Sequence, residues 1–513
     1  MPDRALTTRD WIGFMAMVVG MFMAILDIQI VSSSLNEIQA GIAASSDEAT
    51  WIQTSYLIAE VISIPLSGFM ARLVSTRILF TFSAIGFTLA SMLCAMAWDI
   101  NSMIVFRALQ GFIGGAMIPT VFAAAFTVFP PARRNMLSVL MGLVATMAPT
   151  LGPTVGGYIT EISSWHWLFL ANLLPGILVA ISVWILVDFD KPDWSLLPGL
   201  DYLGLLLMAL FLGSLEYVLE EGPRDDWFED HLIATFGVVS LVAGIAFLWR
   251  VLSYRQPIVD IRAFANRNFL IGSSFSFIIG IGLYGSTYLL PLFLSHIRGY
   301  SALDIGIVMI VTGSFQFMSA PIAGRLAAYL DPRVMLGFGL AMFGAGAYAQ
   351  SLLTAEWGFW EFFLPQALRG FALMFLFIPI NAAALGTLPP ERVKNASGLY
   401  NLMRNLGGAV GLAAINSVLN DRFALHWKRL VEGLPAGDPN VQAFLNNAQH
   451  GISGAMGAMS EEGAIKMLGN LVYREAQVLT MADAQFLMSA LFIAGICLVP
   501  LLRRPRGPVQ ADH

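Results

Sequence analysis

Long apolar runs follow one another along this chain and are separated by short polar segments. A run of about twenty apolar residues is long enough for a helix to cross roughly 30 Å of hydrocarbon. The pattern therefore predicts an all-α polytopic membrane protein with fourteen transmembrane helices. The predicted spans are 11–34, 49–70, 77–98, 102–129, 134–157, 166–188, 200–221, 232–252, 268–294, 303–327, 333–354, 360–387, 396–418 and 480–502.

Short segments of the first half return in the second half. IPLSG at 64–68 returns as APIAG after 256 residues, and RALQGF at 107–112 returns as QALRGF after 259. PPAR at 130–133 returns as PPER, again after 259 residues. Such a period is too long for a solenoid repeat and predicts a duplicated helix bundle, as in repeat-built secondary transporters.

The repeat offset exceeds the length of six short spans, which predicts two extra helices between the copies. We expect an N-terminal six-helix bundle at 1–190, two inserted transmembrane helices at 191–262, and a C-terminal six-helix bundle at 263–513. The one long connection, 419–479, belongs to the last bundle and is expected on the outer side as a plain cap or a docking surface. It contains plausible helical stretches, such as residues 423–434, and a Gly-Met-Ala segment near 451–459.

Composition agrees with a membrane protein. The chain is 57% hydrophobic and 12% charged, where soluble domains carry about 25% charged residues. Its two cysteines, Cys94 and Cys497, lie inside predicted spans and are expected to be packing residues. No metal-ligand spacing and no ATP-binding motif is present, so we expect no metal and no cofactor. Transport would then draw on an ion gradient.

Basic residues predict the orientation in the membrane. The first apolar run is long enough to span and has no cleavage site, so we expect a retained helix. With a cytoplasmic N-terminus, 18 of the 28 Lys and Arg fall on the cytoplasmic side, 7 outside and 3 within spans. The positive-inside rule then places both termini in the cytoplasm. The cytoplasmic set includes Arg72, Arg77, Arg133, Arg134, Arg255, Arg262, Arg392, Lys394, Arg503, Arg504 and Arg506.

Ionisable residues inside predicted spans are the first candidates for function, because each costs about 2.5–3.5 kcal/mol at a helix centre. They are Asp27, Glu60, Arg107, Arg369 and Arg404. A carboxylate such as Asp27, balanced between burial and a nearby cation, can load and release a proton near neutral pH. The alternative is a buried polar cluster that only locks helices together.

The second span carries a polar stripe. Gln53, Tyr56, Glu60, Ser63 and Ser67 are separated by steps of three and four residues, so they share one face of a helix. A polar face on an otherwise apolar helix is typical of a water-filled cavity. We expect Gln53, Tyr56 and Glu60 to face that cavity.

Two further polar pairs follow the same spacing. Arg107 and Gln110 share a face of the fourth span, and Asn401 and Arg404 share a face of the thirteenth. Arg369 lies in the second copy of the fourth-span motif. We expect Gln110, Arg369, Asn401 and Arg404 to be cavity or substrate residues. The second-half counterpart of Asp27 holds no carboxylate, so any coupling acids lie in the first half. For Arg404, substrate contact and a structural bond to backbone carbonyls remain open.

The sequence APTLGPTVGG at 148–157 ends the predicted fifth span. Proline removes a backbone donor and bends a helix, and glycine permits close packing. A bend there would influence how the outer gate seals. The residues concerned are Pro149, Gly152, Pro153, Gly156 and Gly157.

Taken together, these motifs resemble the major facilitator superfamily, and more narrowly its fourteen-span drug:proton antiporters of the EmrB/QacA type. The resemblance covers nearly the whole chain. LDIQIV at 26–31 is similar to the first-helix pattern, RALQG at 107–111 to the fourth-helix motif and GPTVGG at 152–157 to the fifth-helix antiporter motif. SWHWLFLAN at 164–172 and NASGLYNLMR at 395–404 also look like family blocks.

The resemblance implies a proton-coupled multidrug efflux transporter of the bacterial inner membrane that works by alternating access. It implies proton coupling through Asp27 and Arg107; the assignment of Glu60 rests on the stripe alone. The long outer connection resembles the EmrB branch, which implies an EmrA-like membrane fusion protein and a TolC-like outer-membrane channel as partners. One departure is GFMAR at 68–72, which lacks the Asp that the superfamily carries in this loop.

Three alternatives remain. The first is a proton-coupled exporter of one endogenous metabolite, lipid or siderophore. The second is a membrane-embedded enzyme, against which stands the lack of a clustered nucleophile, acid/base pair or metal set. The third is a passive channel, against which stand the duplicated bundle and the proline-glycine motif. We therefore expect a transporter and not an enzyme.

Overall fold

The computed structural model describes residues 7–254, 256–435, 437–456 and 460–503, and this part of the chain forms helices joined by turns and short loops. The predicted all-α class is confirmed. Arg255, Arg504 and Arg506, which contribute to the predicted charge asymmetry, lie outside the described residues, as do residues 457–459 of the Gly-Met-Ala segment.

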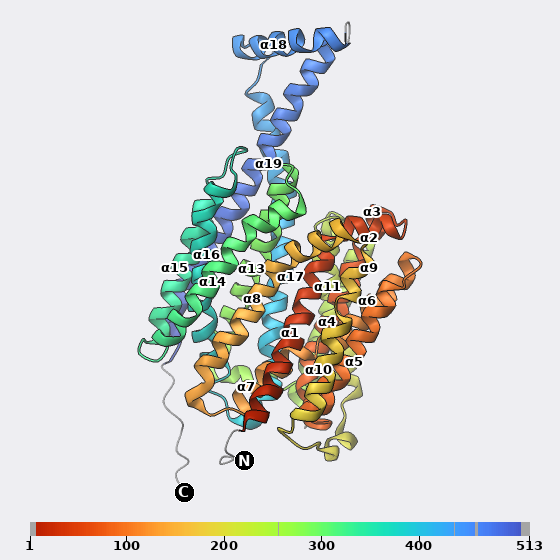
Figure 1. The fold of residues 1–513 in the computed structure, drawn as a ribbon, viewed down its shortest axis with the longest axis vertical. Helices are drawn as coiled ribbons and strands as arrows, with labels where there is room; N and C mark the ends of the chain where they lie inside the picture. Colours follow the sequence, from red (N-terminus) through yellow and green to blue (C-terminus); the bar gives the residue numbers. More distant parts are fainter. Residues whose placement is uncertain (1–6, 255, 436, 457–459, 504–513) are drawn as a thin grey trace.

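The first half holds the helices that supply six predicted spans, two of them broken into shorter pieces. They are α1 (Thr8–Ser33), α2 (Leu35–Gly41), α3 (Ser46–Ala49), α4 (Trp51–Leu73), α5 (Thr76–Ala95), α6 (Ile100–Gly114), α7 (Met117–Thr127), α8 (Pro131–Ile162), α9 (His166–Leu170) and α10 (Leu173–Leu186). Figure 1 shows them in red to yellow.

The insert and the second half follow. The predicted insert comprises η1 (Trp194–Gly199), α11 (Tyr202–Glu221), η2 (Trp227–Glu229), α12 (His231–Ser253) and η3 (Ile261–Ala265). The second half comprises α13 (Arg267–His296), α14 (Ala302–Leu326), α15 (Pro332–Gln350), α16 (Phe359–Ala384), α17 (Pro390–Glu432), α18 (Pro439–Met456), α19 (Ser460–Gly495) and η5 (Ile496–Leu501).

Within the described residues, thirteen helical segments are long and apolar enough to cross a membrane. The remaining predicted span, 333–354, corresponds to α15, a helix of 19 residues that packs between α16 and α19. Arg333 and Gln350 at its ends and its many glycines lower its mean hydropathy. Its helical state therefore depends on its neighbours more than on its own apolar length.

The two copies of the repeat pack in the same way. A Cβ added at Gly111 would lie 2.3 Å from the carbonyl oxygen of Tyr56, and one added at Gly370 would lie 2.2 Å from that of Thr312. The two glycines are 259 residues apart and their partners 256, as the sequence repeats require. Both sites need glycine because helix backbones touch there.

The two halves meet through α4 with α17 and through α8 with α14. These contacts are also related by the repeat. Lys394 Nζ on α17 donates to the carbonyl oxygen of Ala71 at 3.2 Å, and Asn135 Nδ2 on α8 donates to that of Ala327 at 3.5 Å. One polar side chain from each half therefore holds the end of a helix from the other.

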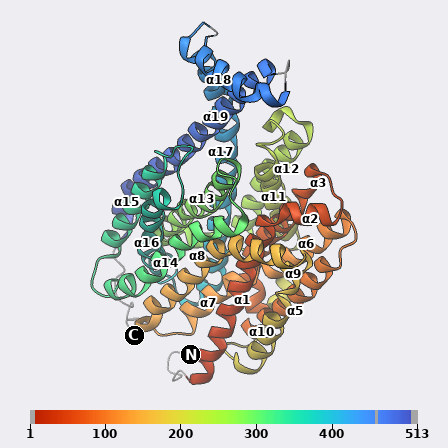
Figure 2. The ribbon, with the colours of Figure 1, turned by 45° about the horizontal axis from the view of Figure 1, so that its top comes forward.

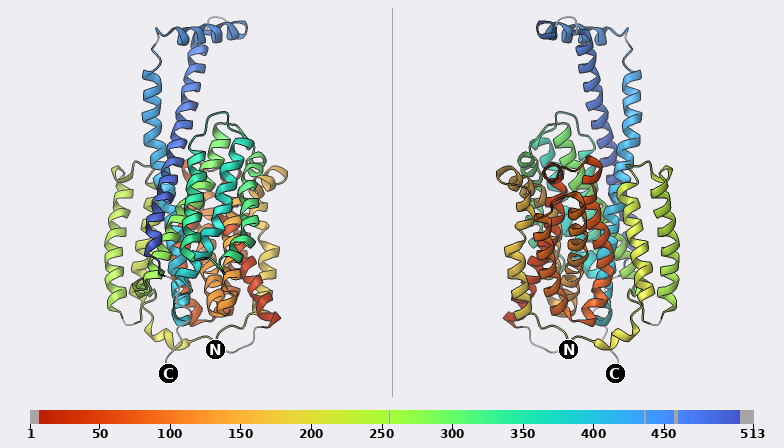
Figure 3. Two further views of the ribbon diagram at one scale, coloured as in Figure 1. Left: turned by 90° about the vertical axis from the view of Figure 1, so that its left-hand side faces the viewer. Right: turned by 90° about the vertical axis from the view of Figure 1, so that its right-hand side faces the viewer.

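The start of α1 and the end of η5 lie at one end of the molecule, and α2, α3 and α18 lie toward the other (Figures 1 and 2). The predicted long loop at 419–479 is a helical projection instead. α17 continues to Glu432, α19 begins at Ser460, and α18 lies across the tip (Figures 1 and 3). Aromatic contacts hold the two long helices together, with ring centroids of Phe423 and Tyr473 at 5.0 Å.

Large apolar side chains cover the outside of the bundle. Phe82, Val105, Leu174 and Leu241 are each more than 60% exposed, as expected where lipid replaces water. The cysteine prediction holds for one residue only. Cys94 is buried among helices, whereas Cys497 is exposed in η5 because that short segment ends the last span at the surface.

Candidate functional site

Asp27 and Arg107 form an ion pair inside the first half. Asp27 lies on α1 and Arg107 on α6, and Arg107 Nη1 is 2.8 Å from Asp27 Oδ2. Both side chains are fully shielded from solvent. A buried carboxylate needs a charged or hydrogen-bonding partner to remain there. The sequence-predicted acid and base are therefore direct partners.

Three more polar groups complete this cluster. Gln110 Nε2 donates to Asp27 Oδ1 at 3.2 Å, and Asn172 Nδ2 donates to the same oxygen at 2.5 Å. Asn172 also donates to Ser91 Oγ at 3.0 Å. The carboxylate of Asp27 thus accepts from α6 and from the start of α10, and both of its oxygens have partners.

The guanidinium of Arg107 is itself held on several sides. Nη1 donates to Gln110 Oε1 at 2.7 Å, and Nε donates to the carbonyl oxygen of Ile52 at 3.2 Å. The ring of Tyr56 lies below it, 4.2 Å from the ring centroid to Cζ, in cation–π geometry. Nη2 is buried and has no hydrogen-bond partner among the described residues. The N–H groups of Nη2 are therefore left unsatisfied within the described residues.

A cavity of about 540 Å³ lies between the two halves. Helices α1, α4, α8, α11, α13, α14 and α17 all contribute to its wall. Its lining runs from Glu60 and Gln53 on α4 to Glu37 and Tyr300 near the end away from the termini. Ile28 and Gln29 line it, so Asp27 lies directly behind its wall.

The predicted stripe on α4 is divided by the structure. Gln53 and Glu60 line the cavity, and Tyr56 instead packs under Arg107, fully buried. Ser63 and Ser67 are buried, and Ser67 Oγ donates to a backbone carbonyl of its own helix. The helix therefore links the cavity, through Glu60, with the ion pair, through Tyr56.

Arg404 and Asn401 lie on α17 beside the cavity but not in its lining. Arg404 Nη2 donates to Asn401 Oδ1 at 2.7 Å, and its guanidinium lies 5.6 Å from the ring centroid of Phe122 on α7. Their neighbours Asn405 and Gly408 do line the cavity. Arg404 acts electrostatically on Glu60, which is on the facing half.

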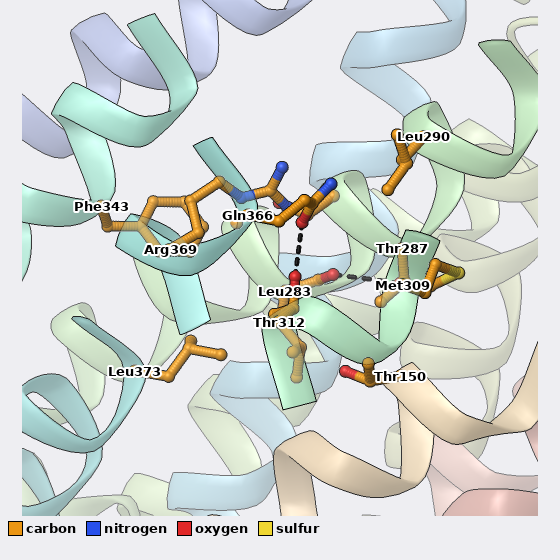
Figure 4. A pocket seen from close by; sticks show the side chains of 12 residues that line it. Thr150, Leu283, Thr287, Leu290, Met309, Thr312, Phe343, Gln366, Arg369 and Leu373 are labelled. Carbon is orange, nitrogen blue, oxygen red and sulfur yellow. Dashed lines mark hydrogen bonds between the residues drawn. The ribbon is translucent and has the colours of Figure 1, made fainter. Parts of the chain in front are cut away.

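Arg369 lies apart from both sites. It lines a small cavity of about 20 Å³ with Thr312 and Gln366, which Figure 4 shows. Arg369 Nη1 donates to Gln350 Oε1, and Thr312 Oγ1 donates to Gln366 Oε1 at 2.5 Å. Arg369 of the second half therefore has the neutral amide of Gln350 as its side-chain partner, whereas Arg107 of the first half has Asp27.

The proline-glycine motif lies inside α8 and does not end the fifth span. The helix continues to Ile162 because packing against α1 and α14 supports it on both sides. An added Cβ at Gly152 would lie 2.2 Å from Gln29 Cβ, and one at Gly157 would lie 2.2 Å from Ala302 Cβ. The motif thus packs against one helix of each half. Its remaining members, Pro149, Pro153 and Gly156, are buried in the same stretch, and Pro153 lines the cavity.

Asp190 forms the contact between the halves at the end near the termini. The superfamily carries an Asp in the loop at 68–72, which this chain lacks. Asp190 forms an ion pair with Lys394 of α17 and accepts from the backbone N–H of Thr76 at 2.9 Å. Lys394 and Asn395 also pack on Gly68 of α4. Asp190 therefore ties the start of α5 to α17, across the two halves.

Sequence reasoning missed four polar residues of these sites. Asn172 ends the block at 164–172, and Ser91 gave no signal among other small residues of its span. Asp190 lies just past the sixth span. Glu216 lies on α11 in the predicted seventh span and lines the cavity. Its spacing of four from Glu220 was the available signal. Among the described residues, no group of three His, Cys, Asp or Glu is placed to hold a metal ion.

Known proteins resemble this chain over most of its length. The family model described as Major Facilitator Superfamily matches residues 17–412. The colistin resistance protein EmrB of Acinetobacter baumannii is 45% identical over 416 residues, 81% of each chain. The multidrug export protein EmrB of Escherichia coli K12 is 30% identical over 496 residues, 96% of this chain and 95% of the relative.

A solved structure shares the fold. The human organic anion transporter MFSD10 (TETRAN) aligns with a TM-score of 0.58 at 12% sequence identity, covering 96% of this chain and 99% of the other. At this identity the likeness concerns the arrangement of helices alone.

Proposed function

Because the chain belongs to the major facilitator superfamily, in the group that contains the EmrB export proteins, we propose that it is a proton-coupled multidrug efflux transporter. It exports bulky hydrophobic or amphipathic compounds by alternating access. The observation that carries the proposal is the cavity between the halves, with the buried Asp27–Arg107 pair directly behind its wall.

The proton-coupling step follows from this arrangement. Asp27 is an acid that can exchange its arginine partner for a proton, and the residues next to it line the cavity. Protonation would release Arg107, whose contacts reach Tyr56 and Ile52 on α4. Protonation of Asp27 would therefore alter the contacts of Arg107 with α4, a helix that also forms part of the cavity wall. A charge moving through the membrane potential supplies about 2.3 kcal/mol per 100 mV.

Alternating access is supported by the asymmetry of the closed end. Contacts between α4 and α17 and the Asp190–Lys394 pair block the cavity toward the termini. Its lining reaches the opposite end at Glu37, His296 and Tyr300. With the termini in the cytoplasm, this conformation faces outward. The basic residues at the terminal end support an inner-membrane protein in that orientation.

The helical projection formed by α17, α18 and α19 supports a partner at the outer end. We propose that it docks an EmrA-like adaptor, which joins the transporter to a TolC-like channel. The projection extends away from the spanning bundle (Figure 3).

Dye accumulation tests the proposed function. Cells that express the protein should accumulate less of a neutral lipophilic dye than cells with empty vector, and an uncoupler should remove the difference. Equal accumulation in both strains would refute export. A growth-inhibition panel with a deletion strain separates the two substrate readings. Sensitivity to several unrelated compounds supports multidrug export, and sensitivity to none supports the exporter of one endogenous compound.

A further inference from the structure

The inserted helix α11 brings carboxylates to the central cavity. Glu216 and Glu220 are one turn apart on α11, and both line the cavity. The side chain of Glu216 is only 4% exposed, and its Oε2 atom has no hydrogen-bond partner among the described residues. A buried charge without a partner is costly, so a position of this kind calls for a ligand or a proton.

The charge around Glu216 has one sign. The ionisable groups that act on Glu216 are Glu220 and Glu60, both acids. Glu60 itself is offset by Arg404 and Arg107. Among the cavity-lining residues that the structure describes there are four glutamates and neither lysine nor arginine, and His296 lies near the outer end. Glu216 and Glu220 are therefore acids of the cavity that have no lysine or arginine beside them among the described lining residues.

The position of α11 is fixed on the side of α4. Thr54 Oγ1 donates to Glu221 Oε1 at 3.0 Å, and the ring of Trp51 stacks on Tyr217 with centroids 5.5 Å apart. Residues 217 and 221 thus face α4, while 216 and 220 face the cavity. The adjacent acids Glu220 and Glu221 therefore have different environments: Glu220 lines the cavity and Glu221 contacts α4.

The position of α11 is also fixed on the side of α17. Trp227 Nε1 donates to Ser417 Oγ at 3.0 Å, and Asn420 Nδ2 donates to the carbonyl oxygen of Pro223 at 2.8 Å. Helix α11 therefore packs against one helix of each half and contributes to the cavity wall. It presents Glu216 from a rigid support.

Aromatic side chains of α13 complete this part of the cavity. Tyr284 and Tyr288 both line it. Tyr284 interacts electrostatically with Glu60 and Glu216, and Tyr288 with Glu220. Tyr288 Oη donates to Asn416 Oδ1 at 2.8 Å, which holds its ring in place. Carboxylates beside aromatic faces are the groups that recognise an organic cation.

We propose that the cavity binds lipophilic organic cations and that Glu216 is the counter-ion of their positive charge. Glu60 and Glu220 add negative potential, and the tyrosine rings contact the apolar groups around the charge. The inference rests on the proposed function, because it names the substrate class of the same cavity. It also gives the inserted helices a role in recognition that a twelve-helix core lacks.

Binding of tetraphenylphosphonium to the purified, full-length protein in nanodiscs tests the inference. The radiolabelled cation is titrated against the wild type and against Glu216→Gln, Glu220→Gln and Glu221→Gln. Glutamine keeps the shape of the side chain, and Glu216 loses no protein partner in the change, so the variant should fold. Glu221→Gln is the matched control, because it removes the same charge from the same helix at a residue that faces α4 and not the cavity.

We expect Glu216→Gln to weaken binding at least about tenfold, the factor of one modest charge pair. Glu220→Gln should have a smaller effect and Glu221→Gln almost none. Neutral triphenylphosphine oxide should not displace the cation. Unchanged affinity in Glu216→Gln, or equal displacement by the neutral compound, would overturn the inference.

The proposed function has a separate readout. If cells export the neutral dye but the protein shows no preference for the phosphonium, the substrate class is wrong and efflux stands. If the protein neither exports the dye nor binds the cation, both proposals fail.

Discussion

Arg107 Nη1 lies 2.8 Å from Asp27 Oδ2, and the two side chains are fully buried between α1 and α6. Their residues are 80 positions apart, and the pair is flanked by the amides of Gln110 and Asn172. Burying a charged pair inside a membrane protein costs free energy, so such a pair is a candidate for a functional role. It is the natural starting point for mutational tests.

Asp27→Asn should abolish proton-coupled export while the protein still inserts, because asparagine keeps the shape but cannot carry the proton. Substrate-driven proton release from proteoliposomes measures this. Asp201→Asn is a matched control, since Asp201 is also a buried carboxylate paired with an arginine, Arg250, at 3.0 Å. Unchanged proton release in the Asp27 variant would rule out the coupling role.

Arg107→Ala should be more damaging than Arg107→Lys. Lysine can supply the positive charge to Asp27, but it cannot reproduce the simultaneous bonds of Nη1 and Nε to Gln110 and Ile52. We expect partial activity in the lysine variant and almost none in the alanine variant. Efflux rates at several pH values give the comparison. Full activity of the alanine variant would exclude both roles of the guanidinium.

Glu60→Cys should react with a membrane-impermeant thiol reagent added from the outer side, because Glu60 lines the cavity that extends that way. The background lacks Cys94 and Cys497. Ser63→Cys on the same helix is the control, since Ser63 is as buried as Glu60 but does not line the cavity. Protection of position 60 under energised and de-energised conditions alike would favour a purely structural role for Glu60.

Lys394→Ala should loosen the closed end near the termini. The Asp190–Lys394 pair is partly exposed, so its loss should cost about 1 kcal/mol or less. That corresponds to a shift of up to about fivefold in the population that opens toward the termini. Spin-label distances between α4 and α17 report the shift. The exchange Asp190→Lys with Lys394→Asp should restore part of the wild-type population, because the ion pair returns while the bonds to Thr76 and Ala71 are lost. An unchanged population in Lys394→Ala would show that other contacts hold this end.

Shortening the helical projection should separate transport from resistance. Residues 430–466 are replaced by a flexible linker, which leaves the contact of Phe423 with Tyr473 and the ion pair of Arg422 with Asp483 in place. No span is touched, so transport in vesicles should continue. Resistance of whole cells should fall if an adaptor docks there. Normal resistance after the change would leave the projection as a dispensable cap.

Much of the fold was predictable because the information is local. The length of each apolar run sets a span, and the repeats at 256 and 259 residues indicate duplication before any contact is known. The structure confirms the helical class, and the family comparison confirms the resemblance. Asp27 and Arg107 were also predictable from local sequence, because each is a charged residue inside an apolar run, where burial is costly. The domain boundaries and the roles assigned to these residues remain predictions.

Apolar periodicity failed where a helix leaves the membrane. The segment 419–479 loses its apolar period, which favoured a loop. Yet α17 and α19 continue through it because each covers the other, as the Phe423–Tyr473 contact shows. The helical stretch expected at 423–434 is confirmed as the end of α17, and pairing between distant segments extends helix beyond it.

Only the tertiary structure decided which polar groups meet. Asn172 lies 145 residues from Asp27 and Lys394 lies 204 from Asp190, distances over which no spacing rule operates. The same holds for α11, which the sequence identifies as an apolar span and the fold places against α4 and α17, with Glu216 in the cavity. The sequence by itself determined which groups are too costly to bury without a reason. The packing of helices, which sets distances between remote residues, determined the partner that each one has.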